Sequence, residues 1–192
     1  EFQTNVIAIA GVYLEGKYPG DAVFQLEKFI GEQNALDTSS LPPQELLHHR
    51  RRLSDVHDML GMIALQSAKP AEAVKHYRAA LAVSADRLRT LVVLAKVYSS
   101  HPDSSVRDGQ EALALARRAC ELTPSSHPDA LDALAAAHAE NGNFEEAIAA
   151  AREAVAAARK RGATQIAASI SRRLRLYEAG KPFRQGGGPG PK

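Results

Sequence analysis

The sequence lacks several features that would assign it to other protein classes. It has one cysteine and no tryptophan among 192 residues. A single cysteine excludes a disulfide scaffold and a multi-cysteine zinc module. The sequence has no run of about 18 apolar residues, the length that a membrane-spanning helix needs. A net charge of +2 and a charged content of 24% disfavour both bulk disorder and bulk nucleic-acid binding.

Alanine is the residue that the sequence has in abundance, at 35 of 192 positions. Alanine is the best helix former because it loses no side-chain entropy when the helix forms. Small side chains also allow helices to approach one another closely. Together with an aromatic content of only 5%, the composition predicts closely packed helices. The length allows one domain or two small ones.

Small residues recur at fixed spacing along the chain. Ala22 follows Ala10 after 12 residues, and Phe29 follows 7 residues later. The same spacing links two further sets, and a fourth set has five extra residues in its first gap: Gly61, Ala73 and Ala80; Ala135, Ala147 and Ala154; Ala95, Ala112 and Ala119. Each set predicts two short amphipathic helices joined by a turn that contains glycine, proline or asparagine.

This pattern resembles the tetratricopeptide repeat (TPR) family, whose unit has about 34 residues. Three groups of positions match its motif: Leu131, Leu134, Ala135, Gly142, Ala147 and Ala154; Leu60, Gly61, Ala73, Tyr77, Ala80 and Leu81; Leu91, Leu94, Ala95, Tyr98, Ala112, Ala119 and Pro124. Where the family has an aromatic residue, this chain has Ala64 in one repeat and His138 in another. The resemblance implies an all-α solenoid, a right-handed superhelix of antiparallel helix pairs.

The resemblance also implies a domain organisation. Residues 1–181 would form the solenoid, with repeats at about 3–36, 54–87, 88–127 and 128–161, an insertion at 37–53 and a capping helix at about 164–179. Pro43 can start a helix, so the first helix of the second repeat is expected to extend toward its N-terminus. The glycine- and proline-rich residues 182–192 are expected to form a flexible tail.

Two segments resemble one bacterial branch of the family. They are Arg107-Asp108-Gly109-Gln110-Glu111-Ala112 and the ending Leu176-Tyr177-Glu178-Ala179-Gly180-Lys181-Pro182-Phe183-Arg184. In that branch the repeats form the C-terminal tail of larger proteins, some with membrane glycosyltransferase domains. The first two residues, Glu1-Phe2, are what an EcoRI cloning site encodes, so we expect a fragment of a longer protein. The cytoplasm is the favoured compartment for this fragment, with a membrane tether if upstream domains exist.

No residue pattern in the sequence supports catalysis, so we predict that the chain is not an enzyme and binds no cofactor or metal. The most conspicuous polar feature is the run His48, His49, Arg50, Arg51 and Arg52. Adjacent helical residues point about 100° apart, so the two histidines do not readily share a metal, and the arginines repel a cation. A solvated helix face is the first interpretation of this basic patch, and a phosphate, nucleic-acid or acidic-partner contact is the alternative.

TPR solenoids line a groove with residues from the first helix of each repeat. By position in the repeat, the resemblance implies a groove lined by Asp55, Asp58, Met62 and Leu65, by Arg89, Val92 and Lys96, and by Asp129, Asp132 and Glu140. The third repeat would be basic there and the fourth acidic. Such a groove suits an extended or helical peptide with apolar anchors and charges of both signs. The alternative role for each charge is helix solubility.

The sequence therefore predicts a scaffold that binds a peptide or a partner protein in the TPR groove. One alternative is self-association into a homo-oligomer, through residues 44–52 or the alanine-rich ends. Another is a non-catalytic appendage that positions an enzyme domain such as a glycosyltransferase. Nucleic-acid binding through the three arginines of the basic patch is the least favoured.

Overall fold

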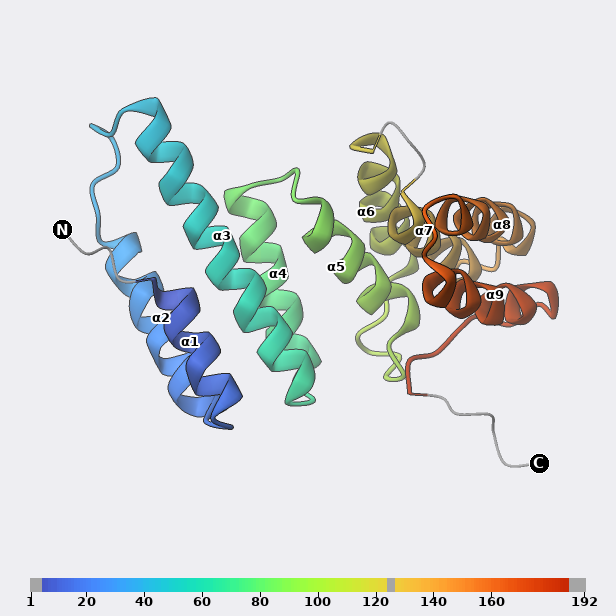
Figure 1. Cartoon of the computed structure of the whole chain (residues 1–192), viewed down its shortest axis with the longest axis horizontal. Coiled ribbons are helices and arrows are strands. Elements are labelled where there is room, and N and C mark those ends of the chain that lie inside the picture. Colours follow the sequence, from blue (N-terminus) through green and yellow to red (C-terminus); the bar gives the residue numbers. More distant parts are fainter. Residues whose placement is uncertain (1–4, 124–126, 187–192) are drawn as a thin grey trace. The chain divides into compact units, whose positions relative to one another are not determined.

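The computed structural model describes residues 5–123 and 127–186, which form nine α-helices and no strand. Figure 1 shows the helices in chain order. They belong to two compact units, unit 1 (residues 1–85) and unit 2 (residues 86–192). The helical fold expected from the alanine content is confirmed.

Unit 1 contains four helices: α1 (Val6–Glu15), α2 (Pro19–Asn34), α3 (Pro43–Gln66) and α4 (Pro70–Val83). Proline is the first residue of α2, α3 and α4, where its missing N–H is not needed by the helix. At 24 residues, α3 is the longest of the four, and it begins at Pro43 as the sequence predicted.

The core of unit 1 lies between α1, α2 and α3 and includes Leu26, Phe29 and Leu60. The small residues of the repeat pattern are fully buried where helices meet, as at Ala10 and Ala22. Gly61 on α3 has a specific reason to lack a side chain. Ring carbons of Tyr77 on α4 lie 2.8 Å from the position that a Cβ atom would occupy.

Unit 2 contains five helices: α5 (Leu88–Ser100), α6 (Gly109–Glu121), α7 (Pro128–Glu140), α8 (Phe144–Lys160) and α9 (Thr164–Glu178). Alanines fill the α7–α8 contact, where seven of the twelve buried core residues of α7 to α9 are alanines of these two helices. The α8–α9 contact is closed by Ile170 and Tyr177, each 1% exposed.

The α5–α6 connection, residues 101–108, contains the five extra residues found in the repeat spacing. Its end is fixed by Asp108, which caps α6 by accepting hydrogen bonds from the backbone N–H groups of Gln110 and Glu111 at 3.1 and 3.0 Å. The start of α6 is also bound to the end of α7, because the Asn141 side chain donates a hydrogen bond to the carbonyl of Gly109 at 2.6 Å. No helix in the described part of the chain is long and apolar enough to cross a membrane.

Candidate functional site

A buried carboxylate joins three helices of unit 2. Asp132 on α7 is only 2% exposed, and both of its oxygens have a cationic partner. The Lys96 ammonium on α5 lies 2.7 Å from Oδ2. The Arg173 guanidinium on α9 reaches Oδ1 through Nε and Nη2, each at 2.8 Å. The charge of Asp132 is therefore compensated on both sides, as a buried ion requires.

Helix periodicity explains why these side chains share a face. Lys96 and Ser100 are four residues apart on α5, and Asp132 and Ala136 are four apart on α7, so each pair lies on one side of its helix. Together with Arg173 they line a cavity of about 90 Å³. We call the surface formed by Lys96, Ser100, Asp132, Ala136 and Arg173 the α5–α7–α9 face.

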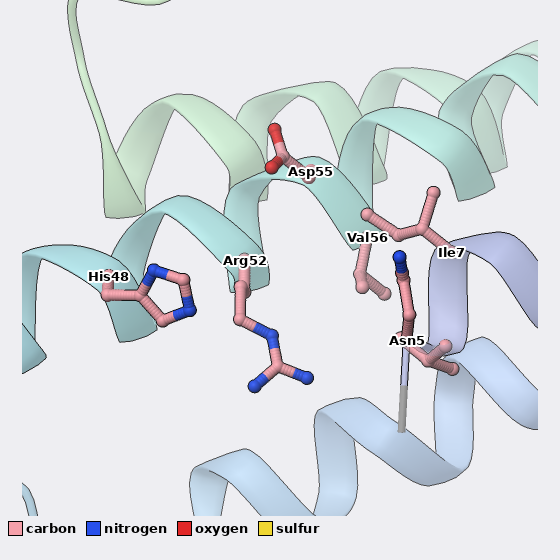
Figure 2. Close-up of a pocket in the computed structure, with 7 residues that line it drawn as sticks. Asn5, Ile7, His48, Arg52, Asp55 and Val56 are labelled. Atoms are coloured by element: carbon pink, nitrogen blue, oxygen red, sulfur yellow. The ribbon is translucent and has the colours of Figure 1, made fainter. Parts of the chain in front are cut away.

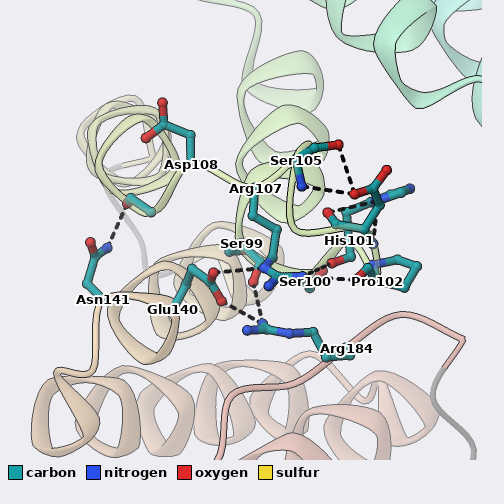
Figure 3. A network of polar contacts seen from close by, with 12 residues as sticks. Ser99, Ser100, His101, Pro102, Ser105, Arg107, Asp108, Glu140, Asn141 and Arg184 are labelled. Carbon is teal, nitrogen blue, oxygen red and sulfur yellow. Dashed lines mark hydrogen bonds and ion pairs between the residues drawn. The ribbon is translucent and has the colours of Figure 1, made fainter.

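A second ionic cluster lies at the C-terminal end of α7. The Glu140 carboxylate contacts two arginines, Arg107 Nε at 2.9 Å and Arg184 Nη1 at 2.6 Å, and Figure 3 shows it between them. Arg107 also donates to the carbonyls of His101 and Pro102, at 2.9 and 3.0 Å. Arg107 therefore ties the α5–α6 connection to α7 and holds Glu140 in place.

Residues 182–185, here called the C-terminal segment, lie against this part of unit 2. After α9, Gly180 adopts a positive φ of 66°, which turns the chain back. Phe183 packs against the core of unit 2, and Arg173 lies over its ring at 5.5 Å from the centroid. Arg184 donates to the Ser99 carbonyl at 3.1 Å, and the Gln185 N–H donates to the Ser100 carbonyl at 2.8 Å.

The C-terminal segment differs from the flexible tail expected for residues 182–192. An aromatic ring and a guanidinium supply the contacts that the glycine-rich composition around them does not predict. Phe183 and Gln185 complete the lining of the 90 Å³ cavity, so the chain's own C-terminal segment covers part of the α5–α7–α9 face. Residues 187–192 of the expected tail lie outside the described residues.

The structure brings only some of the predicted groove residues together. Lys96, Asp132 and Glu140 have their ion-pair partners within unit 2, and so does Asp129, whose Oδ1 lies 3.8 Å from the Lys96 ammonium. Val92 is buried and Arg89 is exposed. In unit 1, all four predicted residues are on α3 and partly exposed: Asp55, Asp58, Met62 and Leu65. The basic and acidic zones expected in the third and fourth repeats neutralise each other through the Lys96–Asp132 pair.

Three site residues were missed by sequence reasoning. Arg173 was not assigned to the site, but its side chain is only 18% exposed because it reaches Asp132. Phe183 and Arg184 were assigned to the tail. The available signal was the occurrence of an aromatic and a charged residue side by side in a segment rich in glycine and proline.

The predicted basic patch is divided between different faces of α3. His48, Arg52 and Asp55 line a cavity of about 400 Å³ beside α1, and Figure 2 shows His48 and Arg52 directed toward it. Arg52 also lies over the Phe29 ring, 5.0 Å from its centroid. Arg50 and Arg51 are exposed, and His49 is partly exposed. The five residues therefore do not present one continuous basic surface.

The reactive groups of the described residues include a histidine pair and a cysteine. His57 and His76 approach each other with their Nδ1 atoms at 3.2 Å, and burial lowers the pKa of both. Burial raises the pKa of the Cys120 thiol, which disfavours the nucleophilic thiolate. Within residues 5–123 and 127–186, no three His, Cys, Asp or Glu side chains are grouped to hold a metal ion.

Comparisons with known proteins agree with this architecture. Residues 129–161, which contain most of α7 and all of α8, match the sequence model of a tetratricopeptide repeat. Among solved structures, the chain is similar to a putative kinesin light chain from Podospora anserina with nearly identical TPR-like repeats. The TM-score is 0.51 at 21% identity, over 91% of this chain and 93% of that chain. No curated protein matches the chain by sequence.

The chain is an all-α solenoid of TPR-like repeats: residues 129–161 match the sequence model of a tetratricopeptide repeat, and the similar solved structure has the same fold. The predictions of fold class and of family are thereby confirmed. TPR repeats are in general protein-interaction modules, and their fold is typically non-catalytic. The further resemblance to bacterial proteins fused to glycosyltransferase domains stays a prediction.

Proposed function

We propose that unit 2 binds an extended segment of a partner protein on the α5–α7–α9 face. The observation that carries this proposal is that the face already holds a non-helical segment, the chain's own residues 182–185. A backbone hydrogen bond, an aromatic contact and a guanidinium contact hold that segment in place. Backbone hydrogen bonds together with side-chain contacts are also what proteins use to recognise peptide segments.

The charges of the face, and the Glu140 carboxylate in the second cluster, are held in position before any partner binds. Lys96 and Arg173 are fixed by the buried Asp132, and Glu140 is fixed by Arg107. A preorganised surface loses little side-chain entropy on binding, which favours affinity. The predicted residues on α3 (Asp55, Asp58, Met62 and Leu65) are proposed as a separate contact surface of unit 1.

A matched pair of substitutions tests the proposal. Ala136→Leu places a larger side chain on the face, where the 90 Å³ cavity gives it space, so unit 2 stays folded. Ala156→Leu makes the same change at an exposed position of α8. Each variant is immobilised, and the proteins captured from an extract are compared by mass spectrometry. Proteins captured by the native chain should be lost with Ala136→Leu and retained with Ala156→Leu. Equal capture by both variants refutes the proposal that partners bind on the α5–α7–α9 face.

Self-association is a second candidate function, favoured by the distribution of exposed apolar side chains. Of the seven large apolar side chains exposed in the described residues, five are in unit 1: Val12, Tyr18, Phe24, Leu36 and Leu47. Exposed apolar surface often marks protein contacts. Light scattering over a range of concentrations tests self-association. A molecular mass that stays that of the monomer at every concentration contradicts it.

A further inference from the structure

We infer that the C-terminal segment is an internal ligand of the α5–α7–α9 face, and that the partner which displaces it carries an aromatic residue followed directly by arginine. This inference rests on the function proposed above for unit 2. It goes further by naming the chemistry of the partner and by making the unbound chain self-inhibited.

The arginine position is defined by a carboxylate and a helix end. Ser99 and Ser100 are the last two residues of α5, and their carbonyls have no partner within that helix. These carbonyls carry the partial negative charge of a helix C-terminus, which favours a cation. Arg184 donates to the Ser99 carbonyl and also pairs with Glu140 at 2.6 Å. Both contacts use the same nitrogen, Nη1, which hydrogen-bonds to the carbonyl and forms an ion pair with Glu140 Oε2.

The aromatic position is defined by Arg173. Its guanidinium lies over the Phe183 ring at 5.5 Å, a distance suited to a cation–π contact. Arg173 does not depend on Phe183 for its own position, since it is held by Asp132 at 2.8 Å and by Ser169 at 3.2 Å. The aromatic site therefore stays formed when the ring leaves.

The same independence holds for the arginine site. Glu140 is held by Arg107, and Arg107 has two further contacts in the α5–α6 connection. Of the two arginines on Glu140, Arg184 is the more exposed, at 30% against 18%. Arg184 is thus the exchangeable partner, and its departure leaves a preformed carboxylate for another arginine.

The fit of the C-terminal segment is incomplete. Phe183 and Gln185 leave a cavity of about 90 Å³ against Lys96, Ser100, Asp132 and Ala136. A larger aromatic side chain can fill this space, and a tyrosine hydroxyl can find polar partners there. A tyrosine–arginine sequence in a partner therefore binds more tightly than the phenylalanine–arginine of the chain itself.

Covalent attachment gives the segment a strong advantage over a free peptide of the same sequence. A short connection produces an effective concentration on the order of millimolar. The segment therefore inhibits weak ligands and yields to a partner with a better fit.

The test is an NMR titration of isotope-labelled full chain with a synthetic peptide of residues 180–186, Gly-Lys-Pro-Phe-Arg-Gln-Gly, up to about 1 mM. The native chain is compared with the double variant Phe183→Ala, Arg184→Ala, in which the face is open. Two further peptides are used, one with tyrosine in place of phenylalanine and one with alanine at both positions. Circular dichroism checks that the variants keep their helices.

The double variant should bind the phenylalanine–arginine peptide at least tenfold more tightly than the native chain, with shifts confined to α5, α7 and α9. The tyrosine peptide should bind more tightly still, and the alanine peptide should not bind. Adding Glu140→Gln to the double variant should weaken binding at least tenfold. A folded double variant that binds no peptide overturns the inference, as does sedimentation of the native chain as a dimer that the double variant does not form, because the segment would then serve a second copy.

The proposed function of unit 2 and the internal-ligand role of the C-terminal segment can fail separately. If the peptide does not bind but Ala136→Leu still abolishes partner capture, the internal-ligand inference is wrong and the proposed function stands. If Ala136→Leu also leaves capture unchanged, the proposed function fails as well.

Discussion

Replacing Arg173 with methionine is expected to lower the free energy of unfolding of unit 2 by about 3 kcal/mol, because it removes one of two cations from a buried carboxylate. Asp132 is 2% exposed, so bulk solvent compensates only weakly for the lost guanidinium. Complete loss of compensation at a buried ion costs about 3–5 kcal/mol. Lys96 remains 2.7 Å from the other carboxylate oxygen and keeps the cost near the lower limit.

The same substitution at an exposed ion pair provides the control. Arg152 on α8 contacts Glu178 on α9 at 3.0 Å, but the two side chains are 66% and 42% exposed. Solvent-exposed pairs contribute about 0–1 kcal/mol, so Arg152→Met should change stability by less than about 1 kcal/mol. Distance is nearly equal in the two pairs, and burial is the variable that differs.

Amide hydrogen exchange measured by NMR is the suitable assay, because it reports opening of α7 without requiring the two units to unfold together. A double-mutant cycle with Asp132→Asn then isolates the Arg173–Asp132 coupling, which should reach about 2 kcal/mol. If Arg173→Met and Arg152→Met reduce protection of α7 equally, burial of Asp132 does not determine the stability of this contact, and the reasoning is refuted.

Three further predictions concern unit 1. Gly61→Ala should destabilise it by about 1 kcal/mol, because overpacking against the buried Tyr77 ring at 2.8 Å outweighs the gain in helix propensity; an increase in the urea midpoint would contradict this. Ala68→Gly should stabilise it by about 0.5 kcal/mol in the same assay, since Ala68 has a φ of 55°, where a Cβ atom is strained. Burial and the nearby His76 hold the pKa of His57 below 6.5, and burial also lowers the pKa of His76. The folded state therefore binds fewer protons than the unfolded state. The free energy of unfolding should therefore fall as the pH drops below about 6.5 and stay flat above it, and His76→Gln should reduce the pH dependence measured by hydrogen exchange of α3; a free energy that rises on acidification would contradict the assignment.

The repeat pattern could be predicted from the sequence because it depends on local geometry. Helices can approach closely only where side chains are small, so Ala10 and Ala22 recur at a spacing set by the length of each helix and turn. The same local reasoning placed the start of α3 at Pro43 and predicted a last helix near the observed bounds of α9, Thr164–Glu178. Periodicity also selected Lys96 and Asp132 as members of one face.

Periodicity did not identify which charges pair. Arg173 and Asp132 are 41 residues apart, and Arg184 and Ser99 are 85 apart. Their contacts depend on how α9 packs beside α7 and on the turn at Gly180, neither of which has a signal in the repeat spacing. For the same reason Asp132 was interpreted as an exposed groove carboxylate, although it is buried between two cations.

The sequence by itself determined the helical class, the TPR-type repeat and the positions where helices meet, because each of these follows from side-chain size at a regular spacing. Only the tertiary structure decided that the charges of neighbouring repeats neutralise each other and that residues 182–185 occupy the α5–α7–α9 face. Those outcomes depend on distances between residues far apart in the chain, and such distances are set by packing rather than by local sequence.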